Sequence, residues 1–110
     1  MINFTIIDWN IEEMTGYKPK TTFYRDFSIC DKFGKSAILD TYKQIEKDLK
    51  HLHYTYIVEL SMALNWKIWE HYEKNEPIAR VYNDLWYKIC NYIQKNFNEE
   101  QLRYYYRVTD

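Results

Sequence analysis

The sequence contains little glycine, proline or cysteine, with only two residues of each among 110. Two glycines are too few for the glycine-rich loops that cradle nucleotide phosphates, and neither a Cys-x-x-Cys pair nor a Ser-x-Gly nucleophile elbow occurs. Two cysteines form at most one bridge, which excludes a disulfide framework. Because glycine and proline are sparse, long stretches of the chain run uninterrupted, which is typical of helices joined by short turns.

The chain also lacks an excess of charge of either sign. Its 15 lysine and arginine residues nearly balance 16 aspartate and glutamate residues, so the net charge is -1 with neutral histidines. A near-neutral chain lacks the attraction that drives sequence-independent nucleic-acid binding, and we expect no direct binding of this kind. The charges are spread unevenly: residues 17–53 hold eight basic and five acidic side chains, a local charge of +3. We interpret them as solvated faces.

Long hydrophobic runs are absent as well. No stretch reaches the roughly 18 consecutive apolar residues that a membrane-spanning helix needs, so no membrane association is expected. Residues 1–9 contain Asp8 but no lysine or arginine, unlike the basic start of a signal peptide. We therefore expect a cytoplasmic protein.

Aromatic residues, in contrast, are abundant at 19%, with 12 tyrosines, 5 phenylalanines and 4 tryptophans. One small domain cannot enclose all of these rings, so several should stand at the surface, where tyrosines commonly form protein interfaces. An AT-rich genome explains the same excess, because codons for Phe, Tyr, Ile, Asn and Lys are rich in A and T. Both explanations stay open.

Turn signals and apolar periodicity predict five helices. We expect long helices over 36–51, 55–75 and 77–97, and short helices near 22–33 and 99–106. Ser36 is the predicted cap of the first long helix, and Gly34 should end the short helix before it. Asn75 should cap the helix that begins at Pro77, and Asn98 with Gln101 resembles a capping box.

Each long helix carries an apolar stripe that should face the core. The stripes comprise Ile38, Tyr42, Ile45, Leu49 and Leu52; Ile57, Leu60 or Ser61, Leu64, Ile68 and Tyr72; and Ile78, Tyr82, Leu85, Ile89 and Ile93. The predicted fold class is all-α, a small antiparallel helical bundle of three long and about two short helices. Residues 17–110 should form this single helical domain, preceded by an N-terminal arm over 1–16 that is extended or forms a short strand.

Polar clusters give no case for catalysis or metal binding. His51 and His53 would point about 200° apart on a helix and cannot share one metal ion, and His71 is the only other histidine. We interpret His51 and His53 as surface residues at a helix end. The acidic residues Glu59, Glu70, Glu73 and Glu76 should form a solvated face paired with Lys67 and Lys74. Cys30 and Cys90 should be small buried hydrophobes. No catalytic residue, metal site or cofactor is expected.

Two aromatic clusters stand out. Trp66, Trp69 and Tyr72 form a ridge at helical spacing, which Trp86 and Tyr87 could meet, and we interpret it as a thick aromatic core. The C-terminal residues Arg103, Tyr104, Tyr105, Tyr106 and Arg107 differ, because three successive rings at about 100° steps cannot all face inward. At least one ring should be exposed, so these five residues are the candidate partner-binding site. The alternative is that the tyrosines fold back and close the bundle.

Several stretches follow one another in a distinctive order: TTFYRDFSI at 21–29, DTY at 40–42, LNWKIWEHY at 64–72, ARVYNDLW at 79–86 and YYRVTD at 105–110. In this order they resemble a group of small uncharacterised proteins of conjugative elements and prophages in low-GC Gram-positive bacteria. The resemblance covers most of residues 18–110 and not residues 1–16. It implies origin on a mobile element and carries no agreed catalytic residues.

The resemblance suggests a non-enzymatic accessory protein of a mobile element that acts by binding a host protein. The leading hypothesis is an inhibitor of a bacterial defence nuclease, such as a CRISPR effector, of the anti-CRISPR type. The alternative is a nucleic-acid-associated factor for transfer or replication of the element, and an orphan enzyme is a third possibility. A homo-oligomer stays open.

Overall fold

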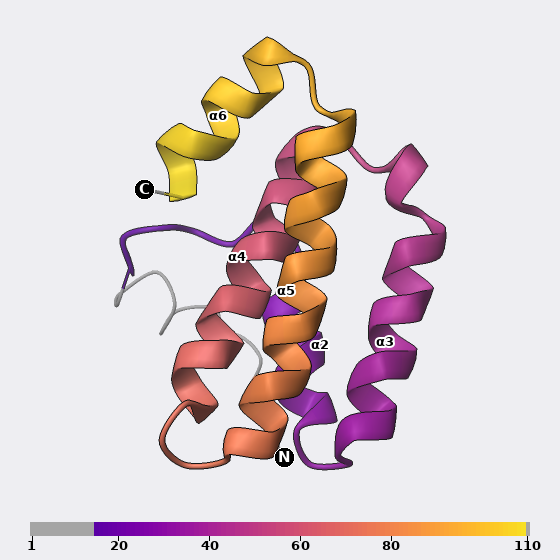
Figure 1. The fold of residues 1–110 in the computed structure, drawn as a ribbon, viewed down its shortest axis with the longest axis vertical. Coiled ribbons are helices and arrows are strands. Elements are labelled where there is room, and N and C mark those ends of the chain that lie inside the picture. The colour runs from indigo at the N-terminus through magenta and orange to yellow at the C-terminus, as the bar shows by residue number, and fades with distance from the viewer. Residues whose placement is uncertain (1–14, 110) are drawn as a thin grey trace.

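The computed structural model describes residues 15–109, and within this range it contains helices and turns but no strand. The elements are α2 (Phe23–Cys30), α3 (Lys35–Lys47), the 3-10 turn η1 (Leu49–His51), α4 (Tyr54–His71), α5 (Glu76–Asn96) and α6 (Glu99–Thr109) (Figure 1). The predicted all-α helical bundle is confirmed. The arm expected over 1–16 falls almost entirely on residues 1–14, outside the described range.

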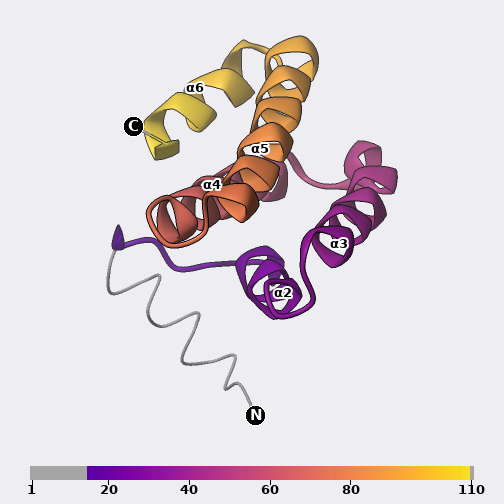
Figure 2. The same cartoon turned by 60° about the horizontal axis from the view of Figure 1, so that its bottom comes forward.

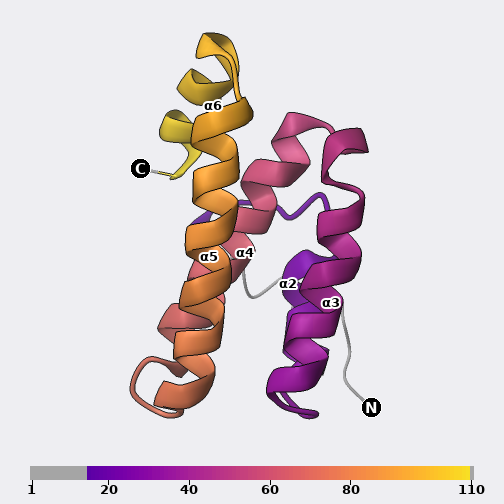
Figure 3. The same ribbon diagram turned by 45° about the vertical axis from the view of Figure 1, so that its right-hand side comes forward.

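The helices form three layers, with an antiparallel pair in the middle. Helices α4 and α5 pack against each other along their length, α2 and α3 cover one side of this hairpin, and α6 lies on the other side (Figures 2 and 3). Helix α6 contacts α4 but spans only one end of the hairpin (Figure 1). None of the described helices is sufficiently long and apolar to span a bilayer.

Two predicted helix starts are confirmed by their hydrogen bonds. The side-chain oxygen of Asn75 accepts a bond from the backbone of Ile78 (3.3 Å), and Pro77 lies in the first turn of α5. Asn98 and Gln101 form a reciprocal capping box, each side chain accepting from the other's backbone amide at 2.9–3.0 Å. Each cap satisfies amides that have no partner inside the helix.

Other predicted boundaries were wrong. Helix α2 ends at Cys30, before the expected residue 33. The predicted cap Ser36 lies inside α3. Gly34 directly precedes α3, and its φ of 94° favours glycine. Helix α3 ends at Lys47, and i to i+3 bonds tighten the chain into η1, where Leu49 is buried. Helix α4 ends at His71 and not at 75.

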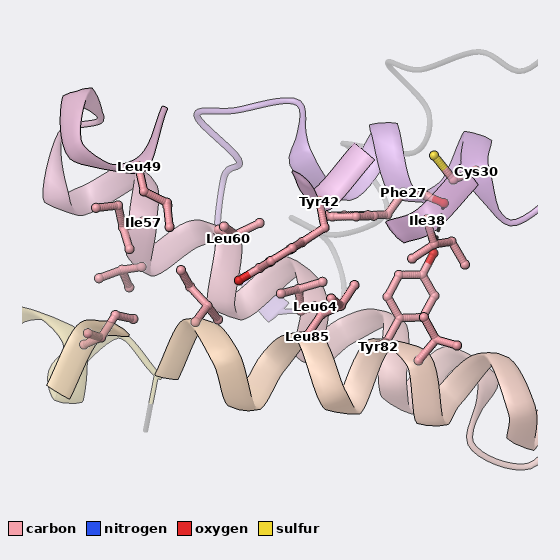
Figure 4. Packing of buried hydrophobic residues seen from close by; sticks show 14 of the residues in the cluster. Phe27, Cys30, Ile38, Tyr42, Leu49, Ile57, Leu60, Leu64, Tyr82 and Leu85 are labelled. Carbon is pink, nitrogen blue, oxygen red and sulfur yellow. Dashed lines mark hydrogen bonds between the residues drawn. The ribbon is translucent and has the colours of Figure 1, made fainter. Parts of the chain in front are cut away.

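The core lies between the α4–α5 hairpin and the α2–α3 layer, and it contains most of the predicted stripe residues. Figure 4 shows Tyr82 reaching from α5 toward Phe27 of α2, with Leu60 and Leu64 beside the hairpin partner Leu85. The rings of Phe27 and Tyr82 meet edge to face with centroids 5.7 Å apart. Both rings are completely buried. Helix α2 therefore contributes to the core through Phe27, which lies outside the three predicted stripes.

Truncating the core at the hairpin should destabilise the protein strongly. Leu64 and Ile89 are both completely buried, so Leu64→Ala and Ile89→Ala should each lower the free energy of unfolding by about 2–5 kcal/mol. Chemical denaturation measures this loss, and Glu73→Ala, at an exposed site on the same hairpin, is the matched control. Losses below about half a kilocalorie at both positions would show that the stripe does not form the core.

Candidate functional site

The predicted partner-binding segment 103–107 lies in the middle of α6, and its three tyrosines point in different directions. Tyr105 is buried, and Tyr104 is half-buried with its ring 5.4 Å from that of Tyr54 in an edge-to-face contact. Tyr106 is 46% exposed, and its hydroxyl bonds to the side chain of Gln94. The prediction that at least one of these rings is exposed is confirmed.

Both arginines of this segment are exposed. The guanidinium of Arg103 pairs with Glu99 one turn earlier at 2.8 Å, and that of Arg107 lies over the Tyr104 ring, 5.6 Å from its centroid. The structure therefore divides the predicted site. Arg103, Tyr106 and Arg107 form a surface, whereas Tyr104 and Tyr105 pack against the rest of the bundle.

A larger aromatic surface lies on the α4–α5 hairpin. Trp69 is 68% exposed, Tyr72 is 61% exposed and Tyr87 is 56% exposed. The interpretation of the tryptophan ridge as core is wrong for Trp69 and Tyr72, because α2 and α3 cover one side of the hairpin and α6 covers only one end of the other. We call Trp69, Tyr72 and Tyr87 the outer face.

Two hollows adjoin the outer face along the seam between α4 and α5. One contains Tyr72 and Ile68 from α4, with Ala79 and Asn83 from α5. Tyr87 lies one helical turn beyond Asn83, on the same side of α5. The second hollow continues toward α6 and is lined by Trp66 and Trp86, with Asn65, Tyr105 and Thr109 among its other residues. The hairpin thus presents aromatic side chains beside recesses that a partner's side chains can enter.

A buried ionic cluster lies on the other side of α4, centred on Lys67. Its side chain is completely buried, and its ammonium lies 2.5 Å from Asp31 Oδ2 and 2.7 Å from Glu70 Oε2. The ammonium also donates to Ser28 Oγ at 3.1 Å and faces the ring of Tyr24 at 5.1 Å from its centroid. The solvated face predicted for this helix is therefore wrong at Lys67, whereas Glu70 is exposed and makes the predicted pair with Lys67.

Asp31 also joins α5 and the end of α4 to the cluster. Its second oxygen accepts a 2.5 Å bond from the Tyr82 hydroxyl, and His71 Nε2 lies 2.8 Å from Oδ2. His71 is half-buried, and its ring stacks on that of Tyr82. Burial, and then the bond to Asp31, raises the pKa of Tyr82 far above its usual range, so this hydroxyl stays a neutral donor.

The side-chain oxygens and nitrogen of Asp31, Glu70 and His71 lie within 4.8 Å of one another, close enough to share a metal ion. Lys67 argues against that use, because its ammonium is bonded to both carboxylates and supplies the positive charge between them. The geometry supports an ionic anchor that fastens α2 to α4 and α5.

Glu59 is a second buried charge, 2% exposed, which contradicts its predicted place on a solvated face. Its carboxylate accepts bonds from the Tyr17 hydroxyl (2.8 Å) and from the backbone amides of Lys20 and Thr21 (2.7 Å each), as well as from the Thr21 hydroxyl. Burial, and then the hydrogen bond to Glu59, raises the pKa of Tyr17. Glu59 therefore fastens the segment before α2 to α4.

The two cysteines are free thiols. Cys30 is buried, with Sγ 3.0 Å from the Thr41 hydroxyl. Cys90 is half-buried rather than fully buried, and its Sγ lies 3.5 Å from the Tyr105 hydroxyl. Burial raises the pKa of Cys90, against a smaller opposite effect of that hydrogen bond, so the thiolate form is disfavoured.

Stripe geometry offered a signal for Lys67. It follows Leu64 by three residues and Leu60 by seven, so it occupies a core position of α4. Glu59 lies about 100° from its neighbours Val58 and Leu60 around the helix, so the stripe gave no signal for it. A charged residue at a core position indicates a partner of opposite charge or a set of donors, although the sequence does not say which element supplies it.

Comparison with known proteins found no matching family model, and neither a curated protein nor a solved structure matches the chain.

Proposed function

We propose that the chain is a non-enzymatic binding protein whose outer face docks onto another protein. The observation that carries the proposal is the exposure of Trp69, Tyr72 and Tyr87, each more than half exposed beside the seam of the central hairpin. Aromatic side chains of this kind bring large contact area at low entropic cost and recur as the anchors of protein interfaces.

The outer face has the arrangement that an interface needs. The Trp69 and Tyr72 rings contact each other with centroids 5.8 Å apart. The apolar residues Ile68 and Ala79 line the recess beside Tyr72. An ion pair between Glu76 and Arg80 borders that recess, which gives an apolar centre with a polar rim. Helices on both sides of the seam fix these positions, so little order has to be gained on binding.

For the partner, we propose a bacterial defence nuclease, such as a CRISPR effector, which the chain inhibits. This choice of target rests on the resemblance to small proteins of conjugative elements and prophages, because such elements benefit from proteins that disable host defence. Arg103, Tyr106 and Arg107 on α6 form a second candidate contact surface for the same partner.

Removing the outer face should abolish inhibition without unfolding the protein. We expect the Trp69→Ala, Tyr72→Ala double variant to lose suppression of target cleavage by purified CRISPR effectors, with binding weakened by about 2 kcal/mol or more per hot-spot residue. The melting temperature should stay almost unchanged, since both side chains are exposed. Lys32→Ala, at an exposed position on the α2–α3 side, is the matched control.

An Arg103→Ala, Arg107→Ala variant separates the two surfaces. Loss of inhibition in this variant alone would move the interface to α6 and contradict the outer-face proposal. If the wild-type chain leaves every effector tested fully active, the nuclease target is wrong. Association that weakens steeply with salt would instead favour a nucleic-acid-associated factor, because phosphate contacts are screened by salt and aromatic contacts are not.

A further inference from the structure

A groove runs between α3 and α5, on a different side of α5 from the outer face. The two helices run toward the same end of the molecule (Figure 1). The residues that line the groove come from the C-terminal part of each helix and from η1. Tyr42 and Leu49 form part of its lining, and Tyr92 and Asn91 of α5 lie opposite, around a hollow of about 420 Å³.

Lysines dominate the charge of this groove. Lys50, Lys88 and Lys95 line it and are exposed, and Glu46 is the one acidic residue among the lining side chains. Among residues 15–109, none of these three lysines forms an ion pair, whereas Lys67, Arg80 and Arg103 all do. Lys47 and Asp48, both exposed, follow Glu46 outside the lining, and their charges cancel.

Helix dipoles explain only part of this cluster. Lys47 and Lys95 lie in the last turns of α3 and α5, where a cation offsets the partial negative charge of the helix end. Lys88 lies seven residues before Lys95, about 10.5 Å along the helix, well beyond the reach of that effect. Repulsion among unpaired lysines is a cost that an anionic ligand relieves.

We infer that this groove binds the sugar-phosphate backbone of single-stranded nucleic acid. Lys50, Lys88 and Lys95 are placed to contact separate phosphates from the two rims of the groove. The half-buried Tyr92 also lines the groove, and an aromatic ring can stack on bases without selecting a sequence. The net charge of -1 that argued against nucleic-acid binding is an average over the chain, and it conceals this local excess of positive charge.

The test measures binding of a fluorescently labelled, mixed-sequence DNA or RNA strand of about 12 nucleotides by anisotropy across a range of salt concentrations. The Lys50→Gln, Lys88→Gln, Lys95→Gln variant should bind at least about tenfold more weakly, and the slope of log K against log salt should fall by about 0.7 per lysine removed. The matched control is Lys18→Gln, Lys32→Gln, Lys74→Gln, which removes the same charge from exposed positions outside the groove and should bind nearly as the wild type does.

A substitution of opposite sign sharpens the test. Glu46→Gln removes the acidic lining residue and should tighten binding of the same strand. Equal weakening by both lysine triples, or no binding of the strand at low salt, would overturn the inference. So would competition by poly-glutamate as strong as that by unlabelled oligonucleotide, which would assign the groove to an acidic protein. The Trp69→Ala, Tyr72→Ala variant should keep full strand binding, so failure here is distinct from failure of the proposed function.

Discussion

Replacing Lys67 with alanine should destabilise the folded chain by about 3–5 kcal/mol, the range for breaking a buried ion pair. The ammonium lies 2.5 Å from Asp31 and 2.7 Å from Glu70, so its removal leaves the largely buried Asp31 carboxylate without this cation, whereas Glu70 is 44% exposed and remains solvated. A small domain has only about 5–15 kcal/mol of stability in total, so this loss is a substantial share of it. Urea denaturation followed by circular dichroism measures the loss.

A double substitution distinguishes the ion pair from simple loss of packing. Lys67→Met keeps the volume of the side chain and should still be strongly destabilising, because both carboxylates remain. Adding Asp31→Asn to Lys67→Met should recover part of the loss, since it removes one uncompensated charge. Lys74→Ala, at an exposed lysine beyond the end of α4, should change stability by less than about half a kilocalorie. A Lys67→Met variant as stable as the wild type would show that the cluster contributes nothing to folding.

The sequence predicted the helices well because their signals are local. The stripe of α5 at Tyr82, Leu85, Ile89 and Ile93 is buried as expected, and the caps at Asn75 and Asn98 make the predicted bonds. Boundaries failed where tertiary packing decides them. No residue near Lys47 forbids helix, yet the chain tightens there into η1, with Leu49 buried in the core.

The outer face was misassigned because helical periodicity identifies a stripe but not how much of the helix a neighbour covers. Tyr72 continues the spacing of Leu64 and Ile68, yet it is 61% exposed. Its burial would require an element over that end of the hairpin, whereas α6 packs near the other end (Figure 1). Exposure of an aromatic ridge depends on which helices pack where, and this information is not local in the sequence.

Both buried charges compensate for a weak element of the fold. Helix α2 has eight residues, too few to be stable in isolation, and its N-cap Thr22 makes no side-chain capping bond. Apolar burial through Phe27 holds its middle against the hairpin, while Asp31 fastens its C-terminal end and Glu59 fastens the chain just before it. The contacts of Lys67 with Asp31 and Ser28, and of Glu59 with Tyr17, join residues about 40 positions apart, so the sequence alone did not pair them.

Replacing Glu59 with alanine should have an effect of similar size, roughly 4 kcal/mol or more, from the loss of several hydrogen bonds to one buried carboxylate. The Tyr17 hydroxyl and the backbone amides of Lys20 and Thr21 would lose their acceptor while still covered by the fold. Hydrogen exchange should show lost protection at these two amides before the amides of α5 are affected, because the segment detaches from α4 first.

Two further variants test whether the carboxylate itself is required. Glu59→Gln keeps the shape but offers one acceptor oxygen and two donors to a site that contains only donors, so it should lose most of the stability that alanine loses. Tyr17→Phe removes a single donor and should cost only about 1–3 kcal/mol, since the remaining bonds to Glu59 persist. If Glu59→Gln instead folds as stably as the wild type, with Lys20 and Thr21 still protected, packing alone holds the segment on α4. The charge at Glu59 would then have no role in anchoring α2.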